Sequence, residues 1–184
     1  MVVLLTVGIV AAGTPARDSA QASAAESPVI EMGVDPATLP PATVSAEAAA
    51  LSTEVSADAI AVFLAENLAI EGEAMLSADT SSLRAADDGE RLVEMERRIE
   101  VAATRGELVV PHHTFDTLRL DVVFTEGPQG GASLGLEATG TVETVTYDAA
   151  GAEQGRISEP FETTWVLRPG PGERWLIVSE VADE

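Results

Sequence analysis

The stretch FETTWVLRPGPGERWLIV, residues 161–178, decides the fold class. Large apolar and polar residues alternate along 161–167, as expected for a strand with one buried face. The PGPG sequence at 169–172 then favours a turn, and the short apolar run 175–178 follows it. Two apolar runs on either side of a Gly- and Pro-rich turn predict a β-hairpin.

The same alternation occurs twice before this hairpin. Residues 118–124 place an apolar residue at every second position, and so do residues 134–142 in a strand that runs to 147. The Gly-rich sequence 127–131 and the turn sequence DAAG at 148–151 separate these runs. Four consecutive strands with short connections predict an antiparallel sheet.

Helical patterns precede the strands. Ser56 is placed to cap a helix, and Gly72 is expected to break or bend it. Asp87 and Glu90 have the spacing of a capping box for a second helix, which Gly106 should end. The apolar faces of the two helices are Ile60, Phe63, Leu64 and Leu68, then Leu92, Met95, Ile99 and Ala102. A short helical segment is expected at 80–86, and residues 46–51 have the composition of one further turn of helix.

These patterns predict one α+β domain over residues 56–184, with two to three N-terminal helices packed on a curved, four-stranded antiparallel sheet. A domain of about 130 residues buries roughly two thirds of its unfolded surface, which is enough for an independent core. An apolar segment at 1–13 and an Ala-, Pro- and Ser-rich stretch at 14–55 precede this domain. The composition of 14–55 predicts a disordered linker.

The apolar run at 2–12 is too short for a membrane-spanning helix, which needs about 20 residues. Its length is typical of a secretory signal peptide, but no Lys or Arg precedes it. Two interpretations stay open: a signal peptide whose basic start is missing, or a truncated membrane anchor. Either one predicts an extracytoplasmic domain, secreted or anchored, that associates with a membrane through its N-terminus only.

The composition excludes several classes of function. The 184-residue chain has a formal charge of −21, so it should not bind nucleic acid. It contains no cysteine, which rules out disulfides and thiolate metal sites. No phosphate-binding loop or calcium-loop pattern is present, and we expect no cofactor and no metal.

The order of helices and strands, with the closing hairpin FETTWVLRPGPGERWLIV, resembles the nuclear-transport-factor-two-like superfamily of cystatin-like, cone-shaped domains. The sequence TGTVETVTYDAAG at 139–151, placed before that hairpin, is similar to the intermembrane-space domain of chloroplast-division proteins and their bacterial relatives. The resemblance covers about residues 56–181. It implies a binding or scaffolding domain held outside a membrane, without cofactors or catalytic residues.

The stretch LVVPHHTFDTL, residues 108–118, contains both histidines of the chain. Adjacent residues of a strand point to opposite faces, so His112 and His113 should not share one metal ion. Enzymes on the resembled fold place an acid and a histidine or tyrosine inside the cone. The residues available for such an alternative pocket are His112, His113, Asp116, Asp121 and Tyr147.

The arms of the closing hairpin offer a different kind of site. Trp165 and Trp175 lie on its two strands and could pair across it, while Arg168 and Arg174 flank its turn. Trp and Arg are enriched in the residues that dominate binding energy at protein interfaces. These four residues are therefore the predicted binding surface, with packing in the core as the simpler explanation of the tryptophans.

Two hypotheses about function follow. The first is a non-enzymatic, extracytoplasmic binding or scaffolding domain tethered to the cell envelope, whose partner is an envelope protein. The alternative is a small-molecule-binding protein, or an enzyme of the lyase or isomerase type, that uses the interior of the cone. A homodimer through the sheet is compatible with either.

Overall fold

The four long strands follow the helices, as the sequence predicts. The computed structural model describes residue 34 and residues 36–51, 56–125 and 131–182, all within the unit Glu31–Glu184. The apolar run at 2–12, residues 14–33 of the predicted linker and most of the loop at 127–131 lie outside the described residues. Within the described ranges, no helix is both long and apolar enough to cross a membrane.

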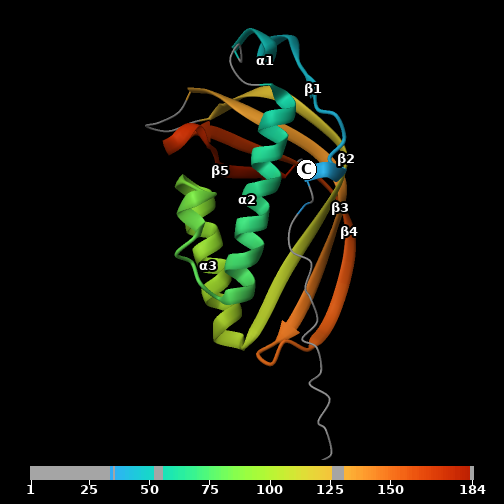
Figure 1. Cartoon of the computed structure of the whole chain (residues 1–184), viewed down its shortest axis with the longest axis vertical. Coiled ribbons are helices and arrows are strands. Elements are labelled where there is room, and N and C mark those ends of the chain that lie inside the picture. Colours follow the sequence, from blue (N-terminus) through green and yellow to red (C-terminus); the bar gives the residue numbers. More distant parts are fainter. Residues whose placement is uncertain (1–33, 35, 52–55, 126–130, 183–184) are drawn as a thin grey trace, which may run out of the picture. The chain divides into compact units, whose positions relative to one another are not determined.

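The helical part consists of α1 (Ala46–Leu51), α2 (Ala57–Ser77) and α3 (Gly89–Arg105), with 3-10 turns at Pro36–Thr38, Leu83–Ala85 and Pro171–Glu173. The strands are β1 (Thr43–Val44), β2 (Glu107–Thr125), β3 (Gly131–Asp148), β4 (Glu153–Pro169) and β5 (Trp175–Ala182). They form one sheet in the order β1-β2-β3-β4-β5. Helices α2 and α3 pack against this sheet (Figure 1).

The α+β class is confirmed, but the sheet has five strands where the sequence predicts four. The additional strand β1 pairs in parallel with β2 through Thr43 and Val44, while every other pairing is antiparallel. Two residues are too few to show an alternation, so the pattern gave no signal for β1. Strand β2 also begins at Glu107, immediately after α3, well before the alternation that starts at Leu118.

Part of the predicted linker belongs to the folded unit. Val34 and Ala48 are buried in the main core, and the Ser45 hydroxyl donates a hydrogen bond of 2.8 Å to Asp121 on β2. The linker prediction is therefore wrong for residues 36–51. The composition of this segment did not predict these contacts, because small residues such as alanine give no periodic pattern.

Helix α2 begins as predicted and ends later than expected. The Ser56 hydroxyl accepts a hydrogen bond of 3.2 Å from the backbone N–H of Ala59. Gly72 neither ends nor interrupts the helix, which continues to Ser77. A glycine inside a helix costs about 1 kcal/mol relative to alanine, and the burial of Leu68 and Ala74 on either side offsets that cost.

The start of α3 corrects the predicted capping box. Asp88, not Asp87, is the N-cap, and its carboxylate accepts a hydrogen bond of 2.8 Å from the backbone N–H of Gly89. The backbone of Ala86 and Asp88 pairs with Ile177 of β5 on both sides of Asp87. This pairing turns the Asp87 side chain inward, so it cannot cap the helix. At the other end, Gly106 has a φ of 67° and terminates α3 as expected.

The core has two parts. The larger part lies between α2 and the sheet, and a smaller cluster joins α3 to the end of α2. The smaller cluster consists of Ala74, Leu83, Leu92, Met95 and Ile99, with Met75 packed against it. These residues hold α3 next to α2 and leave the last turn of α3 beside the first residues of β2.

Candidate functional site

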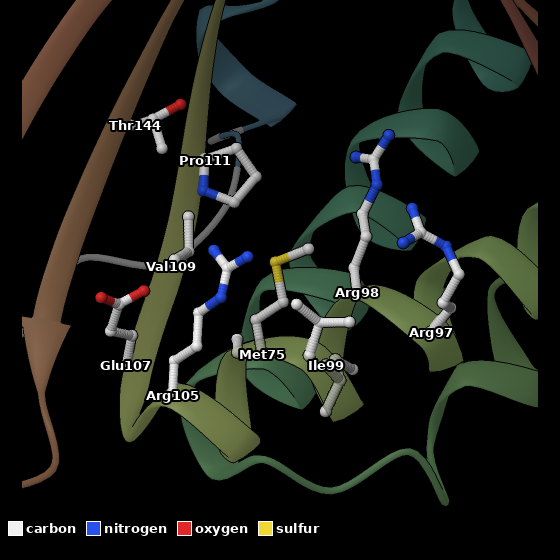
Figure 2. A pocket seen from close by; sticks show the side chains of 11 residues that line it. Met75, Arg97, Arg98, Ile99, Arg105, Glu107, Val109, Pro111 and Thr144 are labelled. Carbon is white, nitrogen blue, oxygen red and sulfur yellow. The ribbon is translucent and has the colours of Figure 1, made fainter.

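A groove runs between the C-terminal half of α3 and the start of β2 (Figure 2). It encloses about 330 Å³, near the lower end of the size of ligand pockets. Ile99 and Ala102 of α3, Met75 of α2, and Val109 and Pro111 of β2 give it apolar walls. Arg97, Arg98, Arg105 and Glu107 supply its charged groups.

The local sequence explains the groove. Arg98 and Arg105 are seven residues apart, so they lie on one side of α3, two turns from each other. Gly106 in its left-handed conformation reverses the chain directly into β2. Every second residue from Glu107 onward then faces the helix, which brings Val109 and Pro111 into the groove.

The three arginines differ in their partners. Arg97 and Arg98 both bind Glu94, with N–O distances of 2.8 Å. Hydrogen bonds from Arg97 and then Arg98 lower the pKa of Glu94 to about 2. Arg105 has neither a hydrogen bond nor an ion pair with any other residue in the described part of the chain. Figure 2 shows its side chain rising from the end of α3 into the groove beside Met75.

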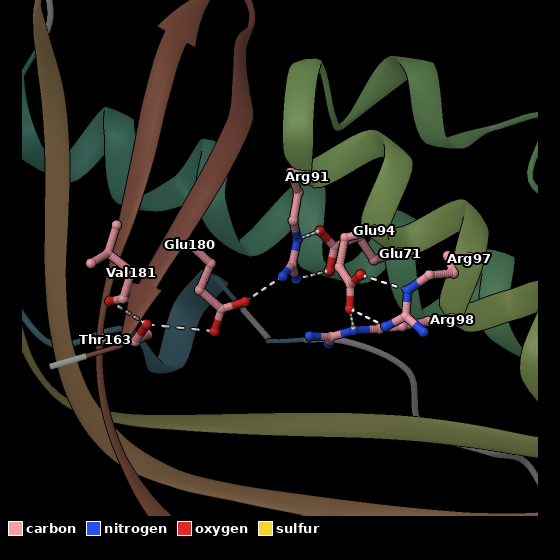
Figure 3. Close-up of polar contacts among 8 residues, drawn as sticks. All are labelled: Glu71, Arg91, Glu94, Arg97, Arg98, Thr163, Glu180 and Val181. Atoms are coloured by element: carbon pink, nitrogen blue, oxygen red, sulfur yellow. Dashed lines mark hydrogen bonds and ion pairs between the residues drawn. The ribbon is translucent and has the colours of Figure 1, made fainter. Parts of the chain in front are cut away.

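A second polar feature is buried between the helices and the sheet (Figure 3). Arg91 of α3 donates two hydrogen bonds, of 2.7 and 2.6 Å, to the carboxylate of Glu71 on α2. It also binds Glu180 of β5. Arg91 is 6% exposed and Glu71 is 2% exposed, so this pair is shielded from water. The network links α2, α3 and β5 through one guanidinium group.

Asp87 lies next to this network and is 2% exposed. Neither of its carboxylate oxygens has a hydrogen-bond partner among the described residues. Burial, followed by repulsion from Glu71, raises the pKa of Asp87 far above its usual range. The side chain is therefore protonated and neutral around pH 7.

His113 and Trp165, two of the predicted site residues, lie next to each other, His113 half-buried and Trp165 buried. The His113 ring contacts Phe115, Phe161 and Trp165 at centroid distances of 5.5–6.2 Å. Burial lowers the pKa of His113 to about 4, so the ring is a neutral member of an aromatic cluster. Trp165 is 1% exposed, and its indole N–H has no partner among the described residues.

The other residues of the predicted alternative pocket do not converge with His113. His112 is half-buried and pairs with Glu143 of β3, and Tyr147 is buried at the end of β3. Asp116 is exposed at a β-bulge and lines a groove with Pro40 and Pro41, and neither histidine lines that groove. Asp121 accepts hydrogen bonds from Ser45 and Arg119, and the Ser45 bond is the main cause of its lowered pKa.

The residues of the predicted hairpin surface are engaged with the domain itself. Trp165 pairs with Glu180, and Trp175 pairs with Pro169, so the two tryptophans do not face each other across the hairpin. Trp175 is half-buried against the core. Arg168 lies 3.4 Å from the Ser133 hydroxyl.

Arg174 is held by α2. It binds Asn67 at 3.0 Å and Glu66 at 3.2 Å, and it lies 5.9 Å from the ring centroid of Phe63. Asn67 in turn donates a hydrogen bond of 2.7 Å to the Trp175 carbonyl. Arg174 therefore fastens the hairpin to α2, which accounts for its place beside the turn.

Within the described residues, no group of three or more His, Cys, Asp or Glu side chains is arranged to hold a metal ion. A scan of protein-family models gives no match, and neither does a search of the curated proteins. Among solved structures, the chain is similar to the intermembrane-space region of the chloroplast protein ARC6. That similarity has a TM-score of 0.50 and 18% identity, over 71% of this chain and 99% of that one.

A structure from Catenulispora acidiphila is matched with a TM-score of 0.45 and 15% identity, over 68% of this chain and 91% of that one. At such identities the likeness to the ARC6 region shows a related fold and nothing about function. The predicted resemblance to the intermembrane-space domain of chloroplast-division proteins is confirmed at that level.

Sequence reasoning identified neither the buried network around Arg91 nor the groove beside Arg105. Glu71 follows Leu64 and Leu68 at helical spacing, so its place on the buried face of α2 was available as a signal. It was harder to predict that Arg105 and Val109 line the same groove, because this depends on where β2 begins.

Proposed function

We propose that the chain is a non-enzymatic binding or scaffolding domain, held outside a membrane and tethered to the cell envelope through its N-terminal segment. The partner is a protein of the envelope. The observation that carries the proposal is the groove between α3 and β2, which is open, apolar along its walls and bordered by an arginine without a partner among the described residues. A surface of this kind is typical of protein recognition.

Among the described residues, the candidate catalytic groups lie apart, which favours a binding domain over an enzyme. A general base must lie within hydrogen-bonding reach of a substrate proton and have a pKa near the working pH. His113 is packed among aromatic rings with a pKa of about 4. Asp116 and Asp121 lie elsewhere, one at an exposed bulge and the other bound to Ser45.

The location and the family are part of the same proposal. The ARC6 region, similar in fold, is described as an intermembrane-space region, which is consistent with a domain outside a membrane. The apolar run at 2–12 supports export or anchoring. The helices-then-sheet order supports distant membership of the nuclear-transport-factor-two-like superfamily with its cone-shaped sheet.

Site-specific photocrosslinking tests the proposal. A benzophenone amino acid replaces Val101, which is exposed and lines the groove, in the 184-residue chain. The matched control replaces Val93, which is exposed on the same helix and does not line the groove. In an envelope extract of the organism that encodes the chain, we expect a discrete protein adduct from position 101 and none from position 93. Identical adduct patterns at both positions would refute the proposal.

A second candidate function is small-molecule binding, or chemistry of the lyase or isomerase type, between the helices and the sheet. The buried and unpartnered carboxyl of Asp87 and indole N–H of Trp165 favour it, because such groups often face a ligand or water. A ligand at about 100 times its dissociation constant would stabilise the fold by about 2.7 kcal/mol. Thermal unfolding against a metabolite panel, with Asp87→Asn as the control, tests this candidate, and it fails if no compound gives a shift that the variant loses.

A further inference from the structure

We infer that the partner segment bound by the α3–β2 groove is acidic, with apolar side chains next to its carboxylates. This inference rests on the proposed function and names the chemistry of the partner. Two independent properties of the groove carry it: its apolar walls and its cationic rim.

The walls select apolar side chains. Met75, Ile99, Val109 and Pro111 line the groove and come from three different elements. Burying apolar surface against such walls is favourable in proportion to the area removed from water. Met75 adds a flexible thioether that adapts to side chains of different shape.

The rim selects carboxylates. Of the ten arginines in the chain, nine lie in the described ranges. Seven of these form ion pairs with carboxylates, and Arg168 contacts Ser133. Arg105 is the exception, with no partner among the described residues although the chain has 31 acidic side chains. An arginine left unpaired in so acidic a chain, beside an apolar groove, is placed to receive a carboxylate from another molecule.

Arg105 also has a simpler role, because a cation in the last turn of a helix stabilises the helix dipole. That role is fulfilled wherever the guanidinium points. It does not explain why the guanidinium extends over the groove beside Met75 (Figure 2). The direction of the side chain is the observation that favours a ligand.

A protein segment fits better than an anionic membrane. A membrane surface interacts with the whole chain, whose formal charge of −21 would repel it. A short segment in the groove interacts mainly with charges inside the Debye length, about 8 Å at physiological ionic strength. Three arginines and one glutamate line the groove. Arg97 and Arg98 share Glu94, so Arg105 is the cation that is left to attract a carboxylate.

Fluorescence anisotropy with synthetic peptides on the 184-residue chain tests the inference. The probe is a labelled peptide of alternating glutamate and leucine, and the comparison peptides exchange glutamate for glutamine or leucine for serine. We expect the glutamate–leucine peptide to bind, and either exchange to weaken binding by about tenfold or more. Arg105→Gln should weaken the glutamate–leucine peptide by about tenfold and leave the glutamine peptide unchanged.

Arg84→Gln is the matched control, because Arg84 is 77% exposed, away from the groove, and its nearest carboxylate oxygen is 4.0 Å away. Its effect on binding should stay below about twofold. Equal losses in the Arg84 and Arg105 variants would overturn the inference. So would binding to phosphatidylglycerol vesicles that depends on Arg105 when the peptides do not bind.

The outcomes separate the inference from the proposed function. A crosslinked protein at position 101 together with no peptide binding would refute the acidic chemistry and retain the binding domain. No adduct at position 101 and no peptide binding would refute both.

Discussion

Replacing Arg91 by methionine tests the energetic importance of the buried network. Methionine keeps an unbranched apolar stem but removes the guanidinium that binds Glu71 and Glu180. Glu71 would then be a buried carboxylate without a cation, next to the buried carboxyl of Asp87. The variant should therefore lose much more stability than the loss of one surface charge would cause.

The size of the expected stability loss follows from the burial of the ion pair. Removing one partner of a buried ion pair costs about 3–5 kcal/mol, because the other charge stays desolvated. The Glu71 contact supplies most of that cost, since Glu180 is exposed and water screens its interaction with Arg91. In a domain of this size each kcal/mol lowers the unfolding temperature by about 2–4 °C, so the midpoint should fall by roughly 6–20 °C.

Urea unfolding followed by tryptophan fluorescence measures the effect, since Trp165 lies in the core. Arg84→Met on the exposed 3-10 turn is the control and should change the unfolding free energy by less than about 0.5 kcal/mol. The double variant Glu71→Leu, Arg91→Met should recover much of the loss, because it removes both buried charges. If the Arg91→Met variant were as stable as the Arg84→Met variant, the network in Figure 3 would contribute little to the free energy of unfolding.

Two further predictions concern buried positions. Because folding raises the pKa of Asp87, the folded state holds a proton that the unfolded state releases above about pH 4, and stability falls as pH rises from there toward the raised value. In urea unfolding at pH 5–8, the unfolding free energy of the original protein should fall by roughly 1 kcal/mol per pH unit, and Asp87→Asn should remove this slope. Parallel pH profiles for the two proteins would contradict this prediction. A Cβ at Gly140 would lie 2.0 Å from the Thr114 carbonyl oxygen, whereas one at Gly155 would meet no atom within 4 Å. Gly140→Ala should therefore cost about 1–3 kcal/mol in the same assay and Gly155→Ala almost nothing, and equal effects would be evidence against the close strand approach.

The helices and strands were predictable where a periodic apolar pattern occurred together with a residue type that starts or ends an element, or with one buried face. Ser56 and Gly106 mark the start of α2 and the end of α3, because each satisfies a backbone need that few residues can meet. The alternation around Trp165 identified β4, since one face of that strand is buried. Strand β1 was not predictable, because its pairing depends on where residues 36–51 pack and not on their own pattern.

The candidate site was much harder to predict. The capping-box pattern assigned Asp87 to the start of a helix, whereas backbone pairing of its neighbours with β5 turns its side chain inward. No local rule contains that contact, because Ile177 is far away in sequence. Similarly, the hairpin arginine Arg174 looked available, and its contacts with Glu66 and Asn67 became apparent only when α2 and the hairpin were seen together.

The scarcity of cations is what makes individual arginines informative in this protein. In a chain with balanced charge, an unpaired surface arginine is common and indicates nothing. Here acidic side chains exceed basic ones threefold, 31 to 10, so a cation finds a carboxylate in most surroundings. Arg91 uses this excess to join three elements in the interior, and Arg156 uses it to join β3 to β4. Arg105 is in the same acidic chain and has no partner among the described residues, which is the reason to look for its carboxylate in another molecule.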